Sequence, residues 1–451
     1  MDGKRILTVG MARSGIAAAE LLHSLGACPI LSDTKPEEAF GDQLEHLREL
    51  GCEFRLGEDQ VALVEECDGV VLSPGVPLKA PVVTAALAKG LPLIGELELA
   101  ATVLPGELYA ISGTNGKTTT TTLLGEILKA AGKESHVAGN IGYPLSLVAL
   151  EAGEEACTVA EVSSFQLETI QTFHPHVAAL LNITEDHLNR HGTMQEYIRL
   201  KARLFENQLE QDYAVLNLED EILRGIAPTL KSRVLYFSRL HQVEQGTFVR
   251  DGKIYWTLDG IEEEICEADQ ILIPGPHNLE NALAAAAMAR AAGIDASFIR
   301  ETLYTFRGVE HRIETVRTLD GITYINDSKG TNVDSTIKAV ESMKVPTVII
   351  LGGYDKHTDF SPLCRLIKAN PLIVHGVIIG QTGPQIARQL REEGYEAITF
   401  AADMKDAVEK SRSLTAPGGN VLLSPACASF DMFQDYEQRG EIFKQIVMEL
   451  E

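Results

Sequence analysis

Short apolar runs alternate with longer amphipathic segments along most of the chain. Near the start, residues 4–9 (KRILTV) form an apolar run, residues 16–26 (IAAAELLHSLG) have helical periodicity, and residues 28–33 (CPILSD) form a second run. Short apolar runs separated by helical stretches are typical of β-α-β units, whose strands pair in parallel. The opening of the chain therefore predicts a parallel sheet covered by helices.

The same rhythm continues to the C-terminus. Further strands are predicted at residues 68–76, 107–112, 156–162, 176–183, 323–327, 347–353, 376–380, 397–401 and 420–426, with helices at 95–106, 119–132, 278–293 and 382–394. Residues 249–258 contain an Asp-Gly pair between apolar positions and predict a β-hairpin. We expect three α/β domains with mostly parallel sheets, at residues 1–95, 96–306 and 307–451, the first and third being Rossmann-like.

Composition and charge narrow the class of protein. Hydrophobic residues are 45% of the chain and charged residues 23%, as in ordinary globular proteins. The net charge of −25 repels polyanions, so we expect no nucleic-acid partner. Seven scattered cysteines without a CxxC pair fit reduced thiols in the cytoplasm. The polar N-terminus and the lack of a long apolar run predict neither a signal peptide nor a membrane span.

A glycine-rich loop joins a predicted strand to a predicted helix at residues 113–118 (GTNGKT). Small residues allow backbone N–H groups to close around phosphate oxygens, Lys117 adds a charge, and Thr118 offers a hydroxyl to Mg²⁺. The loop departs from the usual pattern because Ile111 stands where its first glycine is expected. The alternative is a plain turn capped by Thr. The loop predicts a P-loop ATPase-type central domain.

Other polar residues follow predicted strands of this domain. Glu161 and His187 come after such strands, and carboxylate and imidazole groups suit divalent cations. Lys201 reads as an ordinary, solvated helical lysine from its chemistry alone. Asn278 and Asn281 open the Ala-rich helix, where helix capping and recognition of a nucleobase are equally open interpretations.

The third domain has its polar groups at strand ends too. Residues 310–312 (EHR) begin it, residues 326–332 (NDSKGTN) follow one strand, and residues 352–356 and 424–429 follow two others. Arg312 and Lys329 suit a transferring phosphate. Cys427 has no basic neighbour, so we interpret it as a buried structural thiol.

A second glycine loop lies in the first domain, at residues 10–15 (GMARSG), with Asp33 at the end of the next strand. Ala12 replaces the middle glycine of the dinucleotide fingerprint, so the signal for NAD is weak. A UDP group can use the same loop for its pyrophosphate.

The motifs together resemble a known family. GTNGKTTTTTLL, EVSSFQLE, NITEDHLNRHG, YIRLK, HNLENALAA, HRIE, NDSKGTN, LGGYDK and LSPACASFDMFQDYEQRG run in this order along nearly the whole chain. The set closely resembles the Mur ligases of bacterial peptidoglycan synthesis. SPACASFD with EQRG, and a short first domain with SPG, are most similar to the members that add D-glutamate. The Asp-Asn-Pro-Arg motif of diaminopimelate-adding relatives is absent.

The resemblance implies partners and roles. The implied partners are ATP, two Mg²⁺ ions, UDP-N-acetylmuramoyl-L-alanine and D-glutamate. The protein is expected to be a monomer that works in cell-wall synthesis. ATP contacts are implied for Gly113, Thr114, Asn115, Gly116, Lys117, Thr118, Thr119, Asn278, Asn281, Arg312 and Asp327. Metal contacts are implied for Thr118, Glu161, His187 and a carbamylated Lys201. UDP-sugar contacts are implied for Ser14, Asp33, Thr34, Ser73, Asn140 and His187. D-glutamate contacts are implied for Lys329, Thr331, Lys356, Ser429 and Tyr436, and catalytic roles for Lys117, His187, Lys201 and Lys329.

The expected reaction is phosphorylation of the L-alanine carboxylate by ATP, followed by attack of the D-glutamate amine on the acyl phosphate. Three rivals remain from the residues alone. They are a folylpolyglutamate synthase-like ligase, an NAD-dependent oxidoreductase and a non-catalytic nucleotide-binding switch. The UDP-type first domain argues against the first of them.

Overall fold

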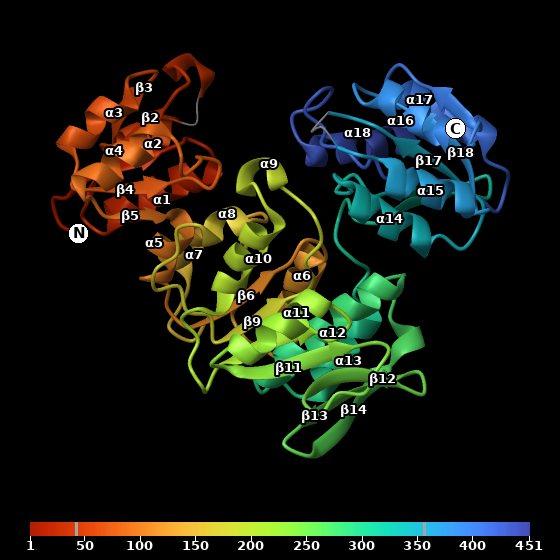
Figure 1. Cartoon of the computed structure of the whole chain (residues 1–451), viewed down its shortest axis with the longest axis horizontal. Helices are drawn as coiled ribbons and strands as arrows, with labels where there is room; N and C mark the ends of the chain where they lie inside the picture. The colour runs from red at the N-terminus through yellow and green to blue at the C-terminus, as the bar shows by residue number, and fades with distance from the viewer. Residues whose placement is uncertain (41–43, 355–357) are drawn as a thin grey trace. The chain divides into compact units, whose positions relative to one another are not determined.

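The computed structural model describes residues 1–40, 44–354 and 358–451. They form two compact units. Unit 1 comprises Met1–Ile271 with Glu280–Thr305, and unit 2 comprises Leu272–Leu279 with Phe306–Glu451. Unit 1 contains two sheets and unit 2 contains one (Figure 1). The expectation of three mostly parallel α/β sheets is confirmed.

The first sheet has five parallel strands in the order β3-β2-β1-β4-β5. Its strands are β1 (Arg5–Val9), β2 (Cys28–Asp33), β3 (Glu53–Leu56), β4 (Gly69–Leu72) and β5 (Leu93–Gly95), and its helices are α1 (Arg13–Ser24), α2 (Glu45–Glu49), α3 (Gln60–Leu63) and α4 (Pro81–Lys89). The strand order reverses between β1 and β4, the position where open α/β sheets bind ligands.

The second sheet has nine strands in the order β14-β13-β12-β11-β10-β9-β6-β8-β7. Its strands are β6 (Glu107–Ser112), β7 (Ser135–Gly139), β8 (Cys157–Glu161), β9 (Val177–Leu180), β10 (Tyr213–Asn217), β11 (Arg233–Ser238), β12 (Gly246–Arg250), β13 (Lys253–Leu258) and β14 (Ile261–Glu267). Its helices are α5 (Glu96–Ala101), α6 (Lys117–Ala130), α7 (Leu145–Glu151), α8 (Ser164–Leu167), α9 (Leu188–His191), α10 (Met194–Ala202), α11 (Glu221–Ile226), α12 (Pro276–Ala291) and α13 (Ala296–Thr305).

The predicted hairpin is present at one edge of this sheet. Strands β12 and β13 pair antiparallel, and β14 pairs antiparallel with β13, so that three strands extend the parallel part (green in Figure 1). Asp251 and Gly252 form the turn with φ values of 51° and 78°. Positive φ at both central residues is the requirement that an Asp-Gly turn meets.

The third sheet has six strands in the order β15-β16-β20-β17-β18-β19, antiparallel only between β15 and β16. Its strands are β15 (Glu314–Leu319), β16 (Ile322–Asn326), β17 (Thr347–Leu351), β18 (Ile373–Ile378), β19 (Ile398–Phe400) and β20 (Asn420–Leu423). Its helices are α14 (Val333–Ser342), α15 (Ser361–Ala369), α16 (Gly383–Glu392), α17 (Met404–Leu414) and α18 (Tyr436–Glu449). Two apolar cores enclose this sheet, one built with α14, α15 and α16 and the other with α17 and α18.

One apolar core runs from the first sheet into the second. Leu22 of α1, Leu97 of α5 and Leu145 of α7 are buried in the same cluster. This shared core explains why the first two sheets form one compact unit. None of the helices in the described residues is long and apolar enough to cross a membrane. Six of the seven cysteines are buried, including Cys427, whereas Cys28 is exposed.

Candidate functional site

The glycine loop at 113–118 follows β6 and ends at the start of α6. Gly116 is the residue before the helix and has a φ of 86°, in the left-handed region that favours glycine. A Cβ atom there would lie 2.3 Å from Oδ1 of Asn281, so only glycine fits beside that amide. Among the residues that the structure describes, no side chain caps the start of α6, which argues against the capped-turn alternative.

Asn182, at the end of β9, holds this loop in place. Its Oδ1 accepts from the backbone N–H of Asn115 at 2.9 Å, and its Nδ2 donates to the Asn115 carbonyl at 3.0 Å. The hydroxyl of Thr114 donates to the carbonyl of Thr184 at 3.0 Å and lies 3.2 Å from the hydroxyl of Tyr197. Asn182 and Tyr197 were missed by the sequence reasoning, although both lie inside motifs that carry the resemblance.

Two lysines converge on the carbonyl of Gly113. Lys117 Nζ donates to it at 2.9 Å and to the carbonyl of Thr114 at 2.8 Å. Lys201 Nζ donates to the same Gly113 carbonyl at 2.8 Å and lies 4.9 Å from the centre of the Tyr197 ring. The structure therefore brings Lys201, which is remote in sequence, to the phosphate loop.

Lys201 is not a solvated lysine, and that interpretation of its chemistry is wrong. Its side chain is in the last turn of α10, on the face that buries Tyr197 and Leu200, and the residue is only 2% exposed. Burial, followed by the nearby charge of Lys117, holds the pKa of Lys201 well below its ordinary value of 10.5. An amine in this environment loses its proton far more easily than a surface lysine does.

Glu161 lies at the carboxyl end of β8 and is 2% exposed. The Nδ2 of Asn140 donates to its Oε1 at 2.9 Å, so these two predicted site residues are adjacent. The carboxylate also acts on the pKa of Lys201 by raising it. The central site thus combines a buried carboxylate, a hydroxyl at Thr118 and two amines beside an uncapped helix start.

His187 lies three residues after Thr184, whose carbonyl accepts a hydrogen bond from Thr114 of the glycine loop. It adopts a left-handed backbone with φ of 53°, and its ring packs on Phe165 with centroids 4.9 Å apart. The neighbouring His191 is buried and lies 3.0 Å from Ser164 Oγ. The side chain of His187 is 38% exposed, so its imidazole remains accessible to a ligand.

A cavity of about 460 Å³ lies at the carboxyl ends of the strands in the first sheet. Asp33, Thr34 and Gly10 line it, and its volume is within the usual range for small-molecule sites. Asp33 accepts from the backbone N–H groups of Met11 at 2.8 Å and Lys35 at 3.0 Å. Its carboxylate therefore shapes the glycine loop of the predicted UDP site.

Ser73 and Ser14 flank the same glycine loop. The hydroxyl of Ser73 donates to the carbonyl of Gly10 at 2.7 Å, and the residue is buried. Ser14 is half-buried in the first turn of α1. Contact of either serine with a UDP-sugar stays a prediction.

Asp327 is a buried acid of unit 2. It is buried after β16, accepts from Ser424 Oγ at 2.6 Å, and accepts from the backbone N–H of Ile313 at 3.3 Å. Burial raises the pKa of Asp327 to about 6, against the lowering effects of Ser424 and Arg312. The carboxylate is ionised at neutral pH and becomes neutral in mild acid.

The residues predicted to hold D-glutamate are partly brought together. Lys329 Nζ lies 5.1 Å from the centre of the Tyr436 ring, and Ser429 is buried on the loop after β20. Thr331 is half-buried two residues after Lys329. Lys356 lies outside the described residues.

Asn278 and Asn281 have different surroundings. The Nδ2 of Asn278 donates to the carbonyl of Pro274 at 2.7 Å, in the turn before α12. Asn281 lies beside Gly116 of the phosphate loop. Nucleobase recognition by either amide stays a prediction.

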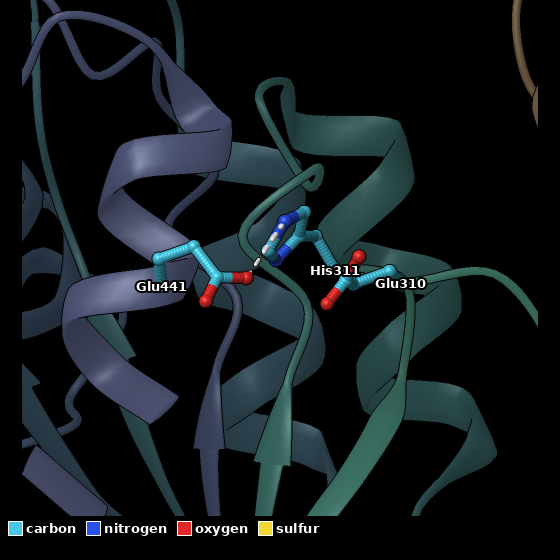
Figure 2. Close-up of side chains that lie close together, drawn as sticks. All are labelled: Glu310, His311 and Glu441. Carbon is cyan, nitrogen blue, oxygen red and sulfur yellow. Dashed lines mark ion pairs between the residues drawn. The ribbon is translucent and has the colours of Figure 1, made fainter. Parts of the chain in front are cut away.

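Glu310, His311 and Glu441 place three possible ligand atoms within 4.8 Å of one another (Figure 2). A lysine already occupies this cluster, because Lys444 pairs with Glu310, with Glu441 at 3.1 Å and with Glu314 at 3.4 Å. We interpret the cluster as an ion-pair network that fastens α18 to the start of β15. It offers no reason to invoke a metal ion.

Comparison with known proteins agrees with this architecture. Residues 4–95 match the family described as Mur ligase MurD-like, N-terminal domain; residues 111–289 match the Mur ligase middle domain; and residues 311–427 match the Mur ligase, glutamate ligase domain. The chain is similar to the UDP-N-acetylmuramoylalanine–D-glutamate ligase of Thermoanaerobacter sp. (strain X514), with 46% identity over 453 residues that cover 100% of this chain and 99% of the relative. A ligase of the same name from Pelotomaculum thermopropionicum is 47% identical over 448 residues, covering 99% and 98% of the two chains.

Solved structures show the same fold at low identity. UDP-N-acetylmuramate-alanine ligase MurC from Thermotoga maritima matches with a TM-score of 0.63 and 21% identity, covering 99% of each chain. MurF ligase from Thermotoga maritima, solved with ADP, matches with a TM-score of 0.61 and 17% identity over 93% of this chain and 95% of that one. The resemblance seen in the motifs is confirmed: this chain belongs to the Mur ligase family, in its MurD branch of UDP-N-acetylmuramoylalanine–D-glutamate ligases.

Proposed function

We propose that this protein is an ATP-dependent ligase that adds D-glutamate to UDP-N-acetylmuramoyl-L-alanine during cytoplasmic synthesis of peptidoglycan precursors. The observation that carries the proposal is the 46% identity to ligases of that name along the whole chain. The family match of the middle domain implies ATP and Mg²⁺ as cofactors. The buried loop, lysines and carboxylate described above support this assignment.

The central domain binds the nucleotide in this proposal. Gly113–Thr119 surround the phosphates with backbone N–H groups, and Lys117 turns from the loop carbonyls to the terminal phosphate. Thr118 and Glu161 would supply oxygen ligands of the kind that suits Mg²⁺, and the imidazole of His187 would complete a second cation site. When bound, Mg²⁺ offsets the negative charge that develops on the transferring phosphoryl group.

Lys201 is proposed to carry a carbamate. The neutral amine is the form that attacks CO₂. Burial lowers the pKa of Lys201, which raises the fraction of the side chain that is neutral. Its nitrogen forms a bond to the CO₂ carbon as one N–H proton leaves, which turns the neutral amine into an anionic oxygen ligand. The burial of Lys201 and its position beside the phosphate loop support this proposal.

The two other substrates are assigned to the remaining predicted residues. The UDP-sugar is assigned to Ser14, Asp33, Thr34, Ser73, Asn140 and His187, which include residues that line the 460 Å³ cavity. D-glutamate is assigned to Lys329, Thr331, Lys356, Ser429 and Tyr436. Asn278, Asn281, Arg312 and Asp327 are assigned to ATP.

The chemistry follows from the weakness of a carboxylate as an electrophile. Transfer of the γ-phosphoryl group to the L-alanine carboxylate forms an acyl phosphate with a good leaving group. Lys117 and Arg312 stabilise charge on the phosphoryl group, and Lys329 is assigned to orient the amino acid. The D-glutamate amine then attacks the acyl carbon, the C–O bond to phosphate breaks, and inorganic phosphate leaves.

An amino-acid panel tests the proposal most directly. Phosphate release is measured with ATP, Mg²⁺ and UDP-N-acetylmuramoyl-L-alanine, and each amino acid is added in turn. We expect release to require both the UDP-sugar and D-glutamate. A clear preference for another amino acid would overturn the specificity. Nicotinamide reduction, or binding without turnover, would favour an oxidoreductase or a switch instead.

Isotope transfer tests the intermediate. We expect ¹⁸O placed in the L-alanine carboxylate to appear in the released phosphate, because the acyl oxygen leaves with the phosphoryl group. Phosphate without the label would contradict the acyl phosphate.

A further inference from the structure

Arg439 is a charged residue that is only 1% exposed, in the first turn of α18. A buried charge is costly unless its hydrogen-bonding groups are all engaged. No role has been assigned to Arg439 in the reaction proposed above. Its contacts show which part of the molecule it serves.

The guanidinium joins two loops. Nε donates to Ser328 Oγ at 2.9 Å and Nη2 donates to the Ser328 carbonyl at 2.7 Å, on the loop after β16. Nη1 donates to the carbonyls of Cys427 at 3.1 Å and Ala428 at 3.3 Å, on the loop after β20. Ser328 Oγ in turn donates to the carbonyl of Tyr436 at 2.8 Å, which also ties the loop after β16 to α18.

A third loop rests on the same group. The backbone N–H of Tyr354 donates to the Ala428 carbonyl at 2.9 Å. A Cβ atom on Gly353 would lie 3.3 Å from Nη1 of Arg439 and 2.3 Å from the Ala428 carbonyl oxygen. The loops after β16, β17 and β20 therefore pack around one buried side chain.

The residues next to these contacts are the ones assigned to D-glutamate. Ser328 directly precedes Lys329, and Ala428 directly precedes Ser429. The oxygens that accept from Arg439 belong to carbonyl and hydroxyl groups, so these hydrogen bonds do not neutralise its positive charge. The charge lies next to two loops that are assigned to a dicarboxylate substrate. Burial lowers the pKa of Arg439 to about 10, which leaves it protonated at neutral pH.

We propose that Arg439 is a positioning residue for the amino-acid substrate, because its guanidinium sets the spacing between Lys329 and Ser429 through Ser328 and Ala428. The inference rests on the proposed function. A planar guanidinium presents N–H groups in two directions at fixed angles, whereas an ammonium is a single point. A lysine at this position keeps the charge but cannot span both loops.

The test compares the KM values for D-glutamate and for UDP-N-acetylmuramoyl-L-alanine in Arg439→Lys. We expect the KM for D-glutamate to rise at least about 20-fold, because small misplacements of binding groups weaken substrate orientation. The KM for the UDP-sugar should stay within about threefold of the wild type, because its residues lie on the first and second sheets and not on the third. Ser328→Ala removes one acceptor and should raise the KM for D-glutamate by about fivefold. This second variant decides the matter if Arg439→Lys does not fold.

Arg317 provides a matched control. Its Nη1 donates to the carbonyls of Val447, Met448 and Leu450 at the other end of α18. Arg317→Lys should lower the thermal stability and leave the KM for D-glutamate unchanged.

Two results would overturn the inference. One is an equal rise of both KM values in Arg439→Lys and Ser328→Ala. The other is a rise of the KM for D-glutamate in Arg317→Lys that matches the rise in Arg439→Lys. Wild-type protein without D-glutamate-dependent phosphate release would instead overturn the proposed function, and the inference with it.

Discussion

Lys117 lies folded over its own loop, with its ammonium bound to the carbonyls of Gly113 and Thr114. In the proposed reaction this ammonium binds the terminal phosphate. We expect Lys117→Ala to lower phosphate release at least about 100-fold, because a fixed charge at the transferring group is lost. Lys129→Ala, at an exposed position of the same helix, is the matched control and should keep full activity. Near-normal turnover in Lys117→Ala would refute the assignment.

The carbamate at Lys201 has a chemical test. We expect Lys201→Ala to lose most activity, because no anionic oxygen remains at that position. Added acetate or formate should restore part of the rate by supplying a carboxylate in the space that the truncated side chain leaves. Full activity of the variant without any additive would exclude a required carbamate. Phosphate release with and without the additive measures both outcomes.

The titration of Asp327 predicts how the enzymatic rate depends on pH in mild acid. Its pKa is raised to about 6, so the carboxylate is protonated below that pH. A raised acid pKa means that the folded state favours the neutral form, and the ionised form exists only above about 6. If ATP binding requires the carboxylate, kcat/KM for ATP should fall as the pH drops through about 6. Asp327→Asn should give a low and flat profile between pH values of roughly 5 and 7.

For single residues, the sequence indicated the chemical type of a side chain better than its burial and its neighbours in the fold. The motifs predicted Glu161 and Asp327 at strand ends and Lys117 at a helix start, and the structure has them there, while their roles stay predictions. Local spacing could not show that Lys201 is buried, because helical periodicity does not say which neighbours cover a face. Arg439 was invisible for the same reason, since its partners are more than a hundred residues away or on another loop.

Among the elements, many buried strands and the hairpin were predicted because each has its own local signal, whereas β10 and β11, which lie inside the second sheet, were missed. The Asp-Gly turn and the alternating residues of 249–258 predict the hairpin before any tertiary contact is known. Strand β15 (Glu314–Leu319) was missed, because mixed polar and apolar residues at a sheet edge give a weak pattern. It pairs antiparallel with β16 and adds the one antiparallel edge to the third sheet.

Helix α5 carries two buried carboxylates, Glu96 and Glu98, and Glu98 binds the segment before β9. Glu98 is 2% exposed and accepts from the backbone N–H groups of Gln171, Thr172 and Phe173 at 2.7–3.0 Å, and from the Thr172 hydroxyl at 2.6 Å. We expect Glu98→Gln to lower the free energy of unfolding by roughly 3 kcal/mol, because the amide group turns a donor toward N–H groups that need an acceptor. Chemical denaturation measures the change. Glu126→Gln, exposed on α6, should have almost no effect.

For the whole molecule, the sequence was sufficient to indicate the fold class and the family but not the grouping of the sheets. The boundaries at residues 95 and 306 remain predictions. The described residues form two compact units that contain the three sheets, because α1, α5 and α7 share one apolar core between the first two sheets. Whether two α/β layers share a core depends on which helix faces meet, and amphipathic patterns do not carry that information.

The uneven burial of the cysteines makes the chain a built-in reporter of its own unfolding. Cys28 is exposed at the start of β2, and the other six sulfurs are buried. A maleimide dye should therefore attach once to the native protein, at the first sheet, and seven times after denaturation. Mass spectrometry of the adducts across a denaturant series would count how many cysteines each step exposes. Rapid labelling of several cysteines under native conditions would contradict this pattern of burial.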